Sequence, residues 1–192
     1  LAVGLSSVLL AIFMGVPLGV IAGFYGGKVD STIMRAMDLI LSFPIHLLAI
    51  VLLVMFTPTA GVIGTIKMTS AIAIVRIPIF ARLVRGSTLS IKEKEYIEAC
   101  RALGQRVPKI LLRHILPNCM APIIVTATLS IATAITLEAS LSFLGLGVPP
   151  SVPSWGAMLA EARAYLRDAW WLATFPGLAL MLTVLAVNIV GD

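Results

Sequence analysis

The chain has 192 residues, of which 59% are hydrophobic and 12% are charged, and its formal net charge is +5 at pH 7. A soluble domain carries about twice that share of charged residues, so lipid must form part of the solvent around this chain. The basic residues lie between apolar stretches rather than on one soluble face, which excludes nucleic acid as a partner. The two cysteines, Cys100 and Cys119, make neither a disulfide framework nor a metal site.

The first apolar stretch, residues 1–24, contains no charged residue and is long enough to cross a bilayer core of about 30 Å as a helix. Gly15, Gly19 and Gly23 recur every four residues, which places them on one face of that helix. We interpret this stripe as a close helix–helix contact. The alternative is that glycine is simply frequent in membrane helices. Residues 25–28 are expected to end the span in a turn.

Four more apolar stretches follow along the chain. They cover residues 39–56, 62–81, 120–146 and 170–190. Together with the first stretch they predict an all-α, polytopic transmembrane helix bundle with five spans. Just before the second span, Arg35 and Asp38 stand three residues apart and are expected to pair at the membrane edge.

Lysines and arginines are unevenly distributed between the connections. Ten lie after the first and third spans: Lys28, Arg35, Arg82, Arg85, Lys92, Lys94, Arg101, Arg106, Lys109 and Arg113. Three lie after the second and fourth spans: Lys67, Arg163 and Arg167. The positive-inside rule therefore predicts that the first set is cytoplasmic and that Leu1 is on the outer side. A cytoplasmic N-terminus would require one more span upstream, so we expect the chain to be a piece of a longer polypeptide with six spans.

The outer connection, residues 149–169, is the second sizeable polar region. Pro149, Pro150 and Pro153 are expected to keep its entry extended. Ser154 is expected to N-cap a short helix behind them. We expect this extracytoplasmic loop to meet an extracytoplasmic partner.

The most charged segment, residues 91–117, is predicted to form two short helices in the cytoplasm. Four apolar residues recur at helical spacing: Tyr96, Cys100, Leu103 and Val107. They predict an apolar stripe along the first helix. Gly104 is expected to end that helix, Pro108 to begin a second one, and Pro117 to break it. An amphipathic helix anchored to anionic head groups is the alternative that these residues leave open.

The spacing within this segment resembles the EAA loop of binding-protein-dependent ABC importer permeases. That loop reads Glu-Ala-Ala, three residues, Gly, nine residues, an aliphatic residue, any residue, then Leu-Pro. Here it corresponds to Glu-Ala-Cys at 98–100, Gly104, and His-Ile-Leu-Pro at 114–117. Cys100 replaces the second alanine and His114 occupies the aliphatic position. We call residues 91–117 the EAA segment.

Four other motifs extend the resemblance across the chain to the dipeptide, oligopeptide and nickel permease group. They are Gly-Phe-Tyr-Gly-Gly at 23–27, Ala-Arg-Leu-Val-Arg-Gly at 81–86, Glu-Ala-Ser-Leu-Ser-Phe-Leu-Gly-Leu-Gly at 138–147 and Pro-Ser-Trp-Gly at 153–156. The last two together are more specific than the EAA loop alone. The resemblance implies a single permease domain over 1–192 with a type I ABC importer permease-like fold, lacking its first span upstream.

In such a family the EAA loop is the helix that couples the permease to the ATPase. By this resemblance, six residues of the chain are expected to take part in coupling: Glu98, Ala99, Cys100, Gly104, Leu116 and Pro117. The implied partners are two cytoplasmic ABC ATPase subunits, a second similar permease, an extracytoplasmic substrate-binding protein and membrane lipid. The implied location is the plasma membrane of a bacterium or archaeon.

The chain has no Gly-x-x-x-x-Gly-Lys-Ser/Thr sequence, so ATP and Mg²⁺ are expected on partner subunits and no cofactor, metal site or enzyme activity is expected here. The implied substrates are peptides or nickel chelates, and no residue distinguishes dipeptide, oligopeptide, glutathione or nickel. A secondary transporter or channel is the first alternative, although it predicts several paired acids within the spans. A membrane scaffold that transports nothing is the second.

Four ionisable residues fall inside the predicted spans, and one of them, Lys67, lies at the start of the third span. Glu138 is expected either on the translocation path or pairing two helices, because an ionisable group in lipid is costly; an interfacial position is the alternative. Arg76 is expected to extend its side chain towards the membrane surface. His46, beside Pro44, is expected to be a packed or hydrogen-bonded helix residue, with a nickel ligand as the alternative.

Overall fold

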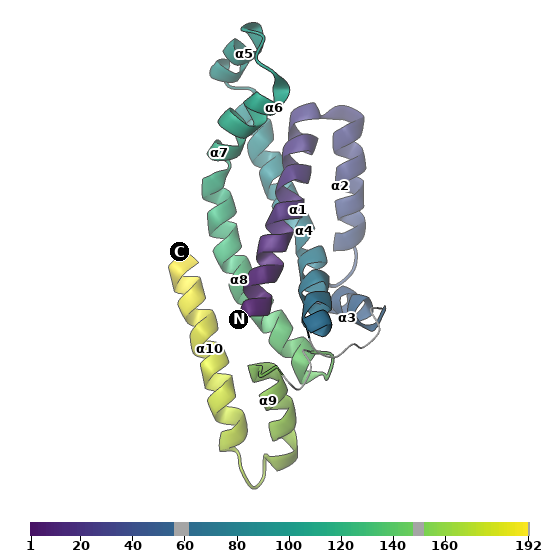
Figure 1. The fold of residues 1–192 in the computed structure, drawn as a ribbon, viewed down its shortest axis with the longest axis vertical. Helices are drawn as coiled ribbons and strands as arrows, with labels where there is room; N and C mark the ends of the chain where they lie inside the picture. Colours follow the sequence, from purple (N-terminus) through teal and green to yellow (C-terminus); the bar gives the residue numbers. More distant parts are fainter. Residues whose placement is uncertain (56–61, 148–151, 192) are drawn as a thin grey trace. The chain divides into compact units, whose positions relative to one another are not determined.

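The computed structural model describes residues 1–55, 62–147 and 152–191, and within these ranges the secondary structure is entirely helical (Figure 1). The long helices are α1 Ala2–Tyr25, α2 Gly27–Leu41, α3 Ile45–Met55, α4 Val62–Lys92, α8 Met120–Phe143 and α10 Trp171–Gly191. The short ones are α5 Glu95–Ala102, α6 Val107–Ile110, α7 Leu116–Asn118 and α9 Trp155–Ala162. A π-helical turn, Leu111–Ile115, joins α6 to α7, and a 3₁₀ turn, Arg163–Tyr165, follows α9.

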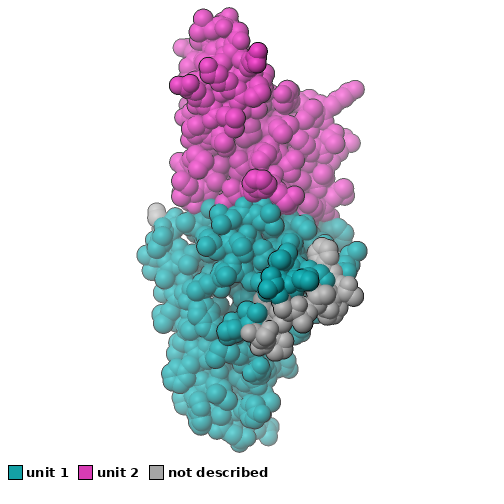
Figure 2. Space-filling model, in the orientation of Figure 1, with its two compact units in different colours: residues 1–10, 43–75, 127–192 teal, residues 11–42, 76–126 magenta. Residues whose placement is uncertain are grey.

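The chain forms two compact units, coloured separately in Figure 2. Unit 1 comprises residues 1–10, 43–75 and 127–192, and unit 2 comprises residues 11–42 and 76–126. Helices α1, α4 and α8 each contribute residues to both units. The units are therefore assembled from interleaved segments and not from successive stretches of sequence.

Four helices in the described ranges, α1, α4, α8 and α10, are long and apolar enough to cross a membrane. They confirm four of the five predicted spans as helices. The second predicted span, residues 39–56, is not one continuous helix. Its first three residues end α2, a break covers residues 42–44, and α3 follows. With 11 residues, α3 is about 16 Å long and is too short to cross a membrane alone. A fifth span is present only if α2 and α3 are counted together as one broken span.

Pro44 explains this break. Its ring removes one backbone donor and disfavours the helical region for the preceding residue, Phe43. Ser42 still donates its backbone N–H to the Asp38 carbonyl, so α2 ends with a closed turn. Phe56, the last residue of the predicted span, lies outside the described residues.

The third predicted span is longer than expected. Helix α4 runs for 31 residues to Lys92 and not to residue 81, so Arg82, Arg85 and Lys92 lie on the helix and not in a loop. These long side chains have good helix propensity, and Gly86 alone does not end the helix. Pro78 is accommodated inside α4, as membrane helices tolerate. The fourth predicted span is shorter, because α8 ends at Phe143 and Gly145 turns the chain with φ +79°.

In unit 2, α1 packs closely on α4 through Gly15, Gly19 and Gly23, which are all buried. A Cβ atom at Gly19 would lie 2.5 Å from the Ala81 carbonyl oxygen, and one at Gly15 would lie 2.8 Å from that of Ile77. Side-chain atoms essentially never approach backbone this closely, so only glycine allows this separation of the two helices.

In unit 1, α9 packs on α8 and on α10. Ser154 N-caps α9 by accepting a hydrogen bond of 3.1 Å from the Ala157 backbone N–H, as predicted. Gly156 is buried, and a Cβ at this position would collide with the Ala139 carbonyl oxygen of α8. The motifs at 138–147 and 153–156 therefore meet at one contact. Pro149 and Pro150, in the predicted loop entry, lie outside the described residues.

Candidate functional site

The EAA segment folds as a helical hairpin around Gly104. Helix α5 carries Glu95 and Glu98 in its first turn, where acidic side chains favour the N-terminal end of the helix dipole. It ends at Ala102, and Gly104 then takes a left-handed backbone conformation with φ +72°. A residue with a side chain adopts this conformation only at a cost, so glycine is the natural choice for the turn.

A buried apolar base supports the EAA segment within unit 2. Ile97 of α5 and Ile115 of the π-helical turn are completely buried, and Ile110 at the end of α6 is 1% exposed. They pack in one core with Val84 and Ile91 of α4. The segment is therefore continuous with the packed interior of unit 2 and not a separate helix lying on a lipid surface.

The predicted apolar stripe on α5 is wrong. Tyr96 is 41% exposed and Leu103 is 86% exposed, whereas Ile97, outside that stripe, is fully buried. The stripe included Leu103 and Val107, but α5 ends at Ala102 and Val107 begins α6. Packing against α4 selected a different face of the shorter helix.

The residues matching the EAA motif lie mostly at the surface. Glu98, Ala99, Gly104 and Pro117 are exposed, and Cys100 and Leu116 are half-buried. Cys100 Sγ lies 3.8 Å from His114 Nε2, so the two departures from the motif contact each other across the hairpin. The exposed Leu103 and Leu112 add apolar surface to the same short segment.

Pro117 does not break the second helix as predicted. The chain passes from the π-helical turn through α7, with Pro117 in its first turn, where a missing backbone N–H is tolerated. The wider π-helical turn accommodates the proline without ending the helical path. Cys119 follows and is completely buried, and burial raises the pKa of its thiol.

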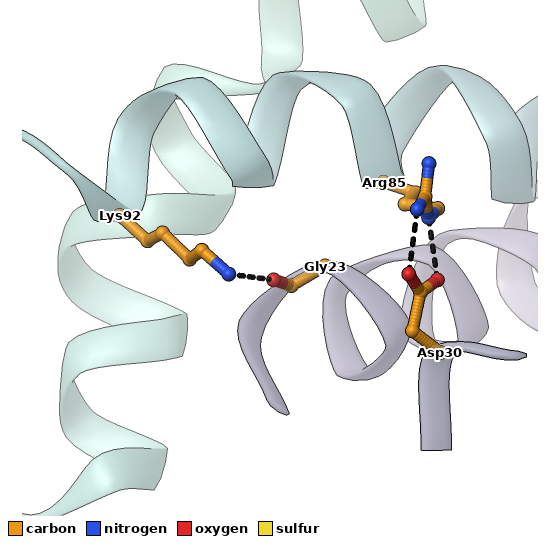
Figure 3. A network of polar contacts seen from close by, with 4 residues as sticks. All are labelled: Gly23, Asp30, Arg85 and Lys92. Carbon is orange, nitrogen blue, oxygen red and sulfur yellow. Dashed lines mark hydrogen bonds and ion pairs between the residues drawn. The ribbon is translucent and has the colours of Figure 1, made fainter. Parts of the chain in front are cut away.

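Polar contacts join α4 to α1 and α2 within unit 2 (Figure 3). Arg85 donates through Nε and Nη2 to the two carboxylate oxygens of Asp30, each at 2.5 Å. This hydrogen bond lowers the pKa of the Asp30 carboxyl from its ordinary value. Lys92 Nζ donates to the Gly23 carbonyl oxygen at 3.0 Å, which satisfies an acceptor in the last turn of α1.

The ion pair predicted between Arg35 and Asp38 is wrong. Asp38 instead pairs with Arg82 of α4. Spacing along α2 permits the first pairing, but α4 brings a second guanidinium to the same carboxylate. A single sequence gave no signal for this long-range partner, because Arg82 was expected in a loop.

Glu138 lies in unit 1 at the wall of a cavity of about 370 Å³. The residue is 6% exposed, and its Oε1 accepts a hydrogen bond of 2.8 Å from Ser142 Oγ one helical turn away. Thr65, Trp155 and Met158 are among the other residues of the cavity wall. Sequence reasoning did not connect these three residues with Glu138, although the Trp-Gly motif at 155–156 was a signal for Trp155.

Two other ionisable residues of the spans have contrasting environments. His46 is exposed in the first turn of α3 and is not part of the cavity wall. Arg76 is 4% exposed, so the expectation that its side chain reaches the membrane surface is wrong. In the described part of the chain its Nε has no hydrogen-bond partner. Packing of the middle of α4 encloses this side chain, which composition could not reveal.

The described helices, four of them long and apolar enough to cross a membrane, place the chain in the class of polytopic helical membrane proteins. A chain of the MetNI methionine ABC transporter, solved in an inward-facing conformation, has the same fold, with a TM-score of 0.77 and 19% identity. The alignment covers 100% of this chain and 88% of that one.

Residues 15–192 match the family described as binding-protein-dependent transport system inner membrane component, and the chain belongs to this family. It is 44% identical over 192 residues to the di/tripeptide transport system permease protein DppC of Pseudomonas aeruginosa. It is 48% identical over 192 residues to the glutathione transport system permease protein GsiD of Pectobacterium atrosepticum. Each alignment covers 100% of this chain and 62% of the relative, so the chain spans about three fifths of their length.

Proposed function

We propose that this chain is part of a permease subunit of a binding-protein-dependent ABC importer that carries small peptides, including glutathione-like ones. The family supports the transporter class, and the names of DppC and GsiD support the peptide substrates. A nickel chelate remains the alternative substrate, with no residue of this chain favouring it. The proposed location is the plasma membrane of a bacterium or archaeon, with residues 149–169 on the outer side.

The observation that carries this proposal is the combination of a solvent-facing EAA surface with a base buried in unit 2. Ala99 and Gly104 are exposed and small, so a partner can approach the backbone closely. Leu103, at 86% exposure, offers an apolar side chain for a pocket in that partner. The proposed partner is a cytoplasmic ABC ATPase, with ATP and Mg²⁺ bound there.

The base provides a mechanical connection from this surface to the spans. Ile97 and Ile115 are packed with Val84 and Ile91 of α4, and the glycines of α1 lie close against the backbone of α4. A displacement of the EAA segment is therefore transmitted to α4 and α1 by direct packing, because close-packed interiors deform little. In this mechanism, ATP-driven closure of two ATPases moves the EAA segments of this permease and a second, similar one, and the spans change between inward- and outward-facing states. A binding protein delivers the substrate.

The test uses the full-length protein with its partner permease, ATPases and binding protein in proteoliposomes. Ala99→Leu adds bulk at an exposed site, so it should leave folding intact and lower both ATPase association and ATP-driven peptide uptake by about tenfold. Ala36→Leu is the matched control, because Ala36 is an exposed alanine on α2 of the same unit. This variant should keep both activities.

Gly104→Asn is a second, independent variant. Asparagine tolerates the left-handed conformation better than most residues, and apart from the two chain neighbours no described residue has an atom within 4 Å of a Cβ at this site. The hairpin should therefore persist while the docking surface changes. Uptake and ATPase association that survive both Ala99→Leu and Gly104→Asn would show that this surface does not couple to an ATPase. Uptake that depends on an ion gradient and not on ATP would favour a secondary transporter.

A further inference from the structure

We propose that the unit 1 cavity beside Glu138 binds the ammonium end of an apolar peptide, with Glu138 as its counter-ion. This inference rests on the proposed function, since it assigns a subsite for the peptide within the permease. The chemistry that the site recognises is a primary ammonium group carried on a small apolar body.

The first argument is the state of the carboxylate. Glu138 is more than nine-tenths buried, and Oε1 is occupied by the hydrogen bond from Ser142. Among the described residues no Lys, Arg or His side chain forms an ion pair with Glu138. A buried carboxylate without a cation is costly, so a bound cation is strongly favoured at this position.

The second argument is the composition of the wall. Trp155 supplies an aromatic ring, and rings attract ammonium groups through their negative faces. Leu1, Ala2, Val3, Val152 and Met158 supply apolar surface, and Thr65 adds one hydroxyl. An apolar wall with one carboxylate and one ring suits a peptide with a free amino terminus and a hydrophobic side chain.

The third argument is that packing holds the two recognition groups in place. Gly156, which follows Trp155 in the sequence, lies directly against Ala139 and Ser142 of α8. These two residues are on the helical turns that carry Glu138. Ser142 holds the carboxylate from the same helix. Arg163 is a basic residue of the outer loop, and its guanidinium carbon lies 5.4 Å from the centre of the Phe143 ring. Its charged group therefore contacts this ring. The site is therefore built from fixed elements before any ligand arrives.

The first experiment measures the charge preference of the cavity in the assembled transporter without binding protein. Met158, which lines the cavity and is 48% exposed, is replaced by cysteine. Labelling at residue 158 is followed by mass spectrometry with methanethiosulfonate reagents bearing either a trimethylammonium or a sulfonate group. The measured quantity is the rate of labelling by the cationic reagent divided by the rate of labelling by the anionic one. This ratio should be about tenfold higher with Glu138 present than after Glu138→Gln.

Glu138→Gln is informative because its amide oxygen still accepts the Ser142 hydrogen bond while the charge is lost. Ser142→Ala is the matched control, since it removes the hydrogen bond and keeps the charge, and it should retain most of the preference for the cation. If Met158→Cys does not assemble, Thr65→Cys places the thiol elsewhere on the same wall. A cation preference unchanged by Glu138→Gln would overturn the proposal.

The second experiment identifies the ligand. Millimolar alanyl-leucine should slow labelling at residue 158, and N-acetyl-alanyl-leucine should not, because acetylation removes the ammonium group. Equal protection by both peptides, or protection by unloaded binding protein alone, would overturn the assignment. Neither measurement requires ATP hydrolysis, so a failure here is distinguishable from a failure of ATPase coupling, which the variants at Ala99 and Gly104 test.

Discussion

The glycine-lined contact between α1 and α4 and the hairpin of the EAA segment use the same residue type in opposite ways. At Gly19, a Cβ atom would lie 2.5 Å from a backbone oxygen, so glycine is needed because there is no space. At Gly104, space is open within 4 Å and glycine is needed because φ is +72°. The first site holds two helices together, and the second exposes a surface that another protein can approach.

This difference separates stability from function within unit 2. Buried residues such as Ile97 and Val84 hold the EAA segment on its base, whereas Leu103 and Ala99 contribute little to that core. Substitutions in the contact should therefore destabilise the protein, and substitutions on the surface should weaken partner binding. Experiments that measure both the free energy of unfolding and the binding of the partner can test this separation.

The largest effect is expected from Gly19→Val. A branched side chain forces α1 away from α4, because it meets two backbone atoms and Val84 Cβ, none of which can rotate aside. The destabilisation should be about 3 kcal/mol or more. Thermal unfolding in nanodiscs would measure it. Gly86→Ala is the matched control, since Gly86 is helical with nothing within 4 Å of a Cβ, and it should stabilise the protein by about 0.5–1 kcal/mol. Equal effects of the two variants would contradict close packing at Gly19.

A smaller effect, of a different kind, is expected from Leu103→Gln. The side chain is 86% exposed, so the free energy of unfolding should change by less than about 0.5 kcal/mol. ATPase association should weaken about tenfold, because an apolar anchor is lost from the proposed interface. Binding of labelled ATPase to the reconstituted permease would measure this. Loss of stability without loss of binding would place Leu103 in the core of the fold.

The smallest effect is expected from Asp30→Asn, which removes the ion pair with Arg85. Partly exposed pairs contribute about 1 kcal/mol or less. Since the pKa of Asp30 is lowered in the folded protein, its stabilisation is present above the ordinary carboxyl pKa of about 4 and is lost as pH falls below it. The stability difference between the wild-type protein and Asp30→Asn should therefore shrink below about pH 4. A difference that grows on acidification would contradict the ion pair.

Much of the fold could be predicted because single helices in lipid are local objects. Runs of apolar residues predict α1, α8 and α10, since a span must satisfy its own backbone hydrogen bonds. The end of α5 near Gly104 and the N-cap at Ser154 are also local, because they depend on backbone conformation and on one side chain. Two boundaries failed: α3 begins only after Pro44, and α4 continues through Arg82 and Arg85, which were expected in a loop. The ion-pair partners of these two arginines, Asp38 and Asp30, lie far away in the sequence.

The all-helical class, the apolar spans, the hairpin around Gly104 and the motifs shared with the permease family can be read along the chain, because each depends on composition or spacing. Three outcomes required the folded chain: Ile97 and not Leu103 faces the core, Asp38 pairs with Arg82, and Trp155 shares a cavity with Glu138. Those outcomes depend on which helices pack together, and a residue's partners across a helix contact lie dozens of positions away in the chain.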